Sequence, residues 1–122
     1  MATTTESEEL IAADAGGEAL FEMTNIRPDR SGLPFIVWMS ARGHARHDVR
    51  VKIAYPPRVQ EFVASVSVRP EIEIVAGAMP PADLAALRRW IALNRDTLIA
   101  YWDGTIQYTE DAMAALLPIE ED

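Results

Sequence analysis

Both histidines of the chain lie in one short segment, MSARGHARHD (39–48), between two stretches that have the composition of β-strands. His44 and His47 could supply two ligands to a metal ion, with Asp48 as a strained third. A zinc or iron site needs three or four ligands. The arginines of the same segment add positive charge, which opposes a divalent cation. We therefore expect no metal here and no other cofactor.

The same segment could bind an anion instead. An arginine presents a planar fork of N–H donors that matches a carboxylate or a phosphate. If residues 41–48 fold over the neighbouring sheet, the basic groups around them could converge on one ligand. The candidate residues of this anion or partner site are Arg42, His44, Arg46, His47, Arg50, Lys52 and Arg58. The alternative without a binding role is a polar hairpin tip in water.

The ligand of such a site could be RNA, DNA, a nucleotide or an acidic partner protein. Only Trp38 and Tyr55 stand near enough in the sequence to stack on bases. Catalysis could be assembled as a ribonuclease, with His44 or His47 as acid or base and Arg46 on the phosphate. The chain has no glycine-rich phosphate loop, no G-x-S-x-G and no cysteine. We therefore expect a binding or protein-interaction module rather than an enzyme, with an RNA-binding protein or toxin-like ribonuclease as the alternative.

Length and composition indicate how many domains the chain has, in which compartment it acts and which partners it favours. A chain of 122 residues fits one domain, and the absence of cysteine suits a reducing cytoplasm. No secretory signal and no membrane-spanning run is visible, so we expect a cytoplasmic protein without membrane association. The net charge of −8 disfavours nucleic acid. Residues 1–22 hold six acids and no base, and we expect them to form a disordered tail before a single domain at 23–122.

Four stretches alternate apolar and polar side chains, as half-buried strands do: 35–40, 49–55, 62–68 and 71–77. Their short connections favour an antiparallel meander. One face of the sheet should be buried and the other wet. The residues expected on the wet face are Arg50, Lys52, Ser65, Ser67, Glu71 and Glu73.

After this the period of the pattern changes to that of a helix. Pro81 suits a first helical position, and Gly104 can form a left-handed C-terminal cap. An apolar stripe between them would cover the sheet, and 108–119 can begin a second short helix with Thr109 as its cap. The expected fold is therefore a two-layer α+β domain, with a four-stranded antiparallel meander under one long C-terminal helix and a short terminal helix after it.

Asn94 lies in the middle of that apolar stripe. A buried amide without partners would cost about 1–3 kcal/mol, so Asn94 should bond to backbone groups of a strand end or loop. We expect a structural anchor that fixes the helix against the sheet. The functional alternative is an amide that orients a ligand.

The stretch EIEIVAGAMPPADLAALRRWIALNRDTLIAYWDG (71–104) resembles a DUF4160-type family of small uncharacterised bacterial proteins. The residues that carry the resemblance are Trp90, Asn94, Arg95, Leu98 and Trp102. A histidine-containing loop precedes a strand in this family too, although it typically reads Pro-Pro-His-x-His. The family has no established activity, and its members are often suspected of belonging to toxin–antitoxin-like gene pairs. The resemblance therefore implies the fold, and it suggests a protein partner that we cannot name.

Overall fold

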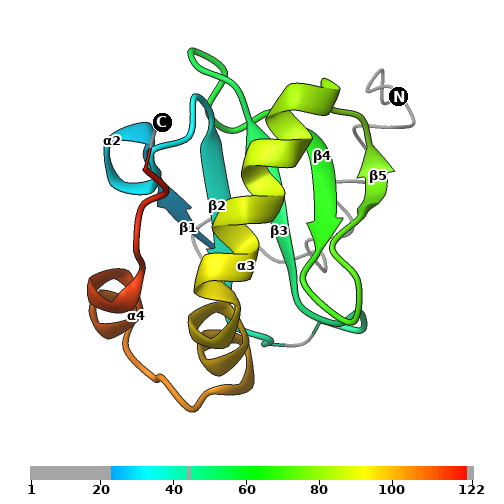
Figure 1. Cartoon of the computed structure of the whole chain (residues 1–122). Helices are drawn as coiled ribbons and strands as arrows, with labels where there is room; N and C mark the ends of the chain where they lie inside the picture. Colours follow the sequence, from blue (N-terminus) through cyan, green and yellow to red (C-terminus); the bar gives the residue numbers. More distant parts are fainter. Residues whose placement is uncertain (1–22, 44, 121–122) are drawn as a thin grey trace.

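The structure, a computed structural model, describes residues 23–43 and 45–120. Within them, five strands form one sheet in the order in which they follow along the chain (Figure 1). The strands are β1 (Met23–Ile26), β2 (Ile36–Ser40), β3 (Arg50–Ala54), β4 (Phe62–Ser67) and β5 (Ile74–Gly77). Each pairs antiparallel with the next, so the sheet is a meander. The α+β class and the antiparallel sheet are confirmed, whereas the expected number of four strands is wrong.

The additional strand is β1, which the sequence does not reveal because its four residues, MTNI, are too few to show an alternation. Pairing with β2 holds it, from Met23 opposite Ser40 to Ile26 opposite Val37. The short helix α2 (Pro28–Ser31) follows and ends at Gly32, whose φ is 81°. The tail expected over residues 1–22 lies outside the described residues.

The long helix α3 (Pro81–Asp103) lies across one face of the sheet (Figure 1). Pro81 is its first residue, and Gly104 ends it with φ at 87°, as the sequence predicts. Its buried stripe packs on the inward side chains of the central strands, which include Val37, Val51 and Val66. None of the described helices has both the length and the apolar character needed to cross a membrane.

The opposite face of the sheet differs from the expectation, because its centre is buried. Trp38, Lys52 and Ser65 lie side by side on β2, β3 and β4, and they are only 4%, 2% and 0% exposed. Trp38 Nε1 donates to the carbonyl oxygen of Val59 at 2.8 Å, so the segment after β3 folds against this face. Lys52 Nζ donates to Ser65 Oγ at 3.1 Å.

The reason for this burial is a second apolar cluster on the face that was expected to be wet. Its members are Met23, Ile36, Trp38, Ala54 and Phe62. The expectation holds for Glu71 and Glu73, which precede β5 and are exposed. It holds in part for Arg50 and Ser67, which pair at the ends of β3 and β4 and are half-buried. Lys52 is therefore buried because apolar side chains cover both faces of the sheet around it.

The last helix, α4 (Thr109–Ala115), leads into an extended C-terminal segment, 116–120, that runs beside α3 to α2 (Figure 1). Thr109 is the first residue of α4 and not its cap, since the cap position is that of Tyr108. The Thr109 hydroxyl lies 2.7 Å from the hydroxyl of Tyr101 on α3. The Ile119 N–H donates to the carbonyl oxygen of Ser31 at 2.9 Å. The C-terminal segment thus joins α3 to α2.

Candidate functional site

The segment that contains the histidines is attached to the C-terminal end of α3. The backbone N–H of Arg42 donates to the carbonyl oxygen of Trp102 at 3.1 Å. The ring of His47 stacks on Trp102, with centroids 5.6 Å apart and planes 24° from parallel. We call residues 41–48, of which 41–43 and 45–48 are described, the docked loop. His44 lies outside the described residues, so nothing places it here.

An arginine outside the docked loop fixes its far end. Nε and Nη2 of Arg69, in the turn between β4 and β5, donate to the two carboxylate oxygens of Asp48 at 2.9 and 3.0 Å. Asp103, the last residue of α3, lies 3.8 Å from Nη2 of the same guanidinium. The hydrogen bonds from Arg69 lower the pKa of Asp48, although burial opposes this shift in part. One cation therefore holds together the loop, the turn and the helix end.

Two guanidinium groups of the docked loop stay exposed. No hydrogen bond or ion pair joins the side chain of Arg42 or Arg46 to another described residue, and both residues are exposed. His47 is half-buried, and its Nδ1 lies 2.7 Å from the backbone oxygen of Asp48. That oxygen can only accept, so the ring donates from Nδ1 in this contact.

The other basic candidates do not join the docked loop. Arg50 and Lys52 point to the sheet face opposite α3, because their side chains alternate with Val51, which is in the main core. Arg58 lies beyond the other end of β3, with Nη1 3.5 Å from Glu61. The six candidates that the structure describes therefore do not converge, since the described part of the loop folds toward the helix and not over the sheet.

Of the three aromatic rings that could stack on a nucleobase, two are buried and one is half-buried. Trp102 is 3% exposed and stacks with His47. Trp38 is buried on the opposite face of the sheet. The hydroxyl of Tyr55 donates to Asp83 Oδ2 at 2.6 Å, and burial is the main cause that raises the pKa of this phenol. Within the described parts of the chain, no group of three or more histidine, cysteine, aspartate or glutamate side chains is placed to hold a metal ion.

Asn94 is buried and bonds to the backbone at both ends of its amide. Its Nδ2 donates to the carbonyl oxygens of Trp90 at 3.0 Å and Leu117 at 2.9 Å. Its Oδ1 accepts from the Leu117 N–H at 2.7 Å. The partner is thus the C-terminal segment, so these bonds join α3 to that segment and not to the sheet.

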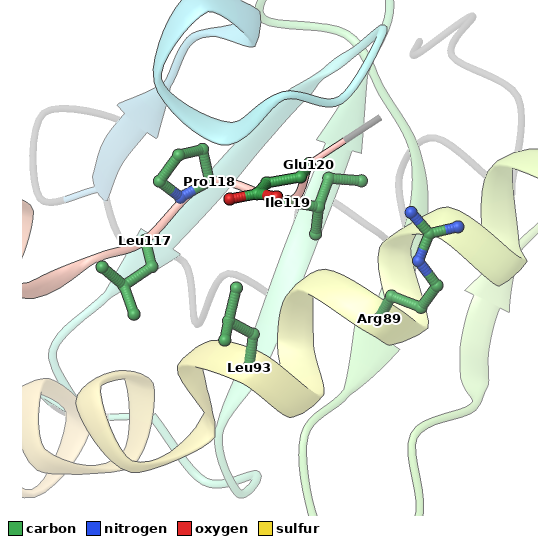
Figure 2. A pocket seen from close by; sticks show the side chains of 6 residues that line it. All are labelled: Arg89, Leu93, Leu117, Pro118, Ile119 and Glu120. Atoms are coloured by element: carbon green, nitrogen blue, oxygen red, sulfur yellow. The ribbon is translucent and has the colours of Figure 1, made fainter. Parts of the chain in front are cut away.

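A groove that sequence reasoning missed lies between α3 and the C-terminal segment (Figure 2). It has a volume of about 660 Å³. Leu93 and Leu117 are large apolar residues in its wall, and they are 48% and 53% exposed. The signal in the sequence is Leu93, an apolar residue on the outward side of α3. The lining residues are Arg89, Leu93, Leu117, Pro118, Ile119 and Glu120.

This arrangement defines a small α+β domain with a meander sheet, one covering helix and a loop docked on the end of that helix. The family model of DUF4160, a domain of unknown function, matches residues 37–103, which is more than half of the chain. The chain belongs to this family. The match runs from β2 to the end of α3 and so includes the docked loop. No curated protein and no solved structure matches the chain.

Proposed function

We propose that the chain is a small cytoplasmic protein-interaction module that binds an acidic segment of a partner protein at the docked loop. We propose further that the two proteins form a toxin–antitoxin-like pair. The observation that carries the proposal is that the backbone of the docked loop is attached to α3 while Arg42 and Arg46 remain exposed. An attached loop loses little conformational freedom on binding, which favours affinity.

The electrostatics of the loop support an anionic ligand. The carboxylate of the loop, that of Asp48, and the carboxylate of Asp103 at the end of α3 are both engaged by Arg69. Arg42 and Arg46 therefore leave this end of an acidic protein locally positive. Guanidinium forks of this kind bind carboxylates with two parallel hydrogen bonds, and they speed the encounter with an acidic partner.

A protein partner is favoured over RNA. Single-stranded RNA is bound by stacking of its bases on exposed aromatic rings, whereas Trp38 and Trp102 are buried and Tyr55 is half-buried with its ring against that of Phe35. A ribonuclease would need a second acid or base beside His47. Among the described residues, the carboxylate that follows His47, that of Asp48, accepts from Nε and Nη2 of Arg69, and these bonds lower its pKa and favour the ionised form.

The test is a titration of the full chain, followed by amide chemical shifts. The probes are a short glutamate-rich peptide and a single-stranded RNA oligonucleotide. The peptide should shift the amides of the docked loop and of the last turn of α3, and the RNA should not bind at moderate salt. Replacing Arg42 and Arg46 with glutamate should weaken peptide binding by about tenfold or more, which is ~1.4 kcal/mol or more.

Arg58→Glu is the control for each single loop substitution, Arg42→Glu or Arg46→Glu, because it makes the same change of charge at the other end of β3. It should leave the affinity for the peptide within about twofold. The proposal is wrong if RNA binds while the peptide does not. It is also wrong if Arg58→Glu weakens binding of the peptide as much as the loop substitutions do.

A further inference from the structure

The groove beside α3 lies apart from the docked loop and has its own chemistry. Figure 2 shows Leu93 pointing from α3 into the space below the C-terminal segment, with Leu117 on one side and Arg89 further along the helix. Glu120 lies on the opposite wall. The groove thus combines exposed leucine side chains with one cation and one anion.

The wall formed by the C-terminal segment is fixed before any ligand arrives. Asn94 holds both the N–H and the carbonyl of Leu117, and the Ile119 N–H bonds to Ser31. A Cβ on Gly32 would come within 2.5 Å of the Ile119 carbonyl oxygen, so the segment is also closely packed on its other side. A preformed groove avoids the cost of ordering a wall during binding.

The charges of the groove are not used within the described structure. No hydrogen bond or ion pair joins the side chain of Arg89 or Glu120 to another described residue. A ligand that carries an acid and a base around an apolar side chain would satisfy both charges and cover the leucines. The groove therefore complements a segment that carries one acid, one base and an apolar side chain.

We infer that this groove binds a short extended peptide of a partner protein. The peptide places an apolar side chain between Leu93 and Leu117, an acidic side chain against Arg89 and a basic side chain against Glu120. A small molecule fits less well, because such ligands are mostly enclosed and five of the six lining residues are exposed. This inference goes beyond the proposed function and does not use Arg42 or Arg46.

The probe is the synthetic peptide Gly-Asp-Leu-Leu-Lys-Gly, added to the full chain while the methyl resonances of Leu93 and Leu117 are followed. These resonances should shift in a saturable way. A peptide with serine in place of both leucines should bind at least about tenfold more weakly. Leu93→Asp in the protein should have the same effect. Val75→Asp should not, because Val75 is an apolar residue of similar exposure (43%) on β5.

Charge reversal tests the orientation of the peptide. Arg89→Glu should weaken binding of the probe, and replacing the aspartate of the probe with lysine should restore it. The charge-reversed loop, with glutamate at 42 and 46, should bind the probe like the parent chain. Failure at the groove is therefore distinguishable from failure of the proposed function.

Three results would overturn the inference. The methyl resonances could stay unchanged up to the solubility limit of the probe. Leu93→Asp could bind the probe as well as the parent chain does. Sedimentation could show that the parent chain self-associates and that Leu93→Asp prevents this, in which case the occupant is a second copy and not a partner's peptide.

Discussion

Replacing Asn94 with leucine should destabilise the protein, although it adds apolar surface to a helix stripe that is otherwise apolar. The amide makes three hydrogen bonds, and two of them serve the N–H and the carbonyl of Leu117. Leucine can serve neither. The loss at the Trp90 carbonyl should matter least, because this oxygen lies inside α3, where the helix itself supplies a donor.

The magnitude follows from these two backbone groups. Leaving each without its partner costs about 1–2 kcal/mol, and the cost is smaller where water can replace the lost bond. Leucine recovers about 1–2 kcal/mol through apolar contact. At the middle of these ranges the free energy of unfolding should therefore fall by about 1.5 kcal/mol. With an m-value of about 2 kcal/mol per molar urea, the midpoint should fall by roughly 0.75 M.

Urea denaturation of Asn94→Leu and of the parent chain measures this change. Arg89→Ala, an exposed substitution on the same helix, should alter stability by no more than about 0.5 kcal/mol. Amide hydrogen exchange adds a local test. The amides of Leu117 and Ile119 should exchange faster in Asn94→Leu, while the amides of the central strands should keep their relative order of exchange rates. A midpoint equal to or above that of the parent would refute this reasoning.

Two further predictions concern a backbone cap and an ion pair. Gly32→Ala should lower the thermal midpoint of unfolding more than Gly104→Ala does. Both glycines have positive φ, but only at Gly32 would the new Cβ meet a backbone atom, the carbonyl oxygen of Ile119. Equal decreases of the two thermal midpoints in calorimetry would argue against that close packing. Asp48→Asn should destabilise by at most about 1 kcal/mol at neutral pH, because the carboxylate is half exposed. Arg69 lowers the pKa of Asp48 below its unfolded value, so its contribution is present above about pH 4 and lost as the pH falls through the folded pKa. Urea midpoints of both chains should therefore draw together as the pH falls below about 4, and a difference that does not shrink on acidification would contradict the ion pair.

The sheet and the long helix could be predicted because their patterns are long enough to read. In β3 the alternation places Val51 and Ile53 in the core, and both are fully buried. Pro81 and Gly104 set the ends of α3 by local backbone chemistry alone. Local signals of this kind need no knowledge of the tertiary contacts.

The remaining features depend on contacts between distant parts of the chain. β1 forms because it pairs antiparallel with β2. Lys52 is buried because Trp38 and Phe62 gather on its face of the sheet, and an alternating strand pattern cannot show that both faces are covered. The docking of Arg42 and His47 on Trp102 joins residues far apart in sequence, so the direction in which the loop folds could not be predicted.

The central claim is that an acidic partner segment binds at the docked loop, and paramagnetic relaxation tests it most directly. A nitroxide is attached to one end of the glutamate-rich peptide, and the broadening of the protein amides is measured. We expect the broadening to be centred on residues 41–43 and 45–48 and on the last turn of α3. Broadening centred instead on the segment around Arg58 or on β5, or none at a saturating concentration of peptide, would contradict it.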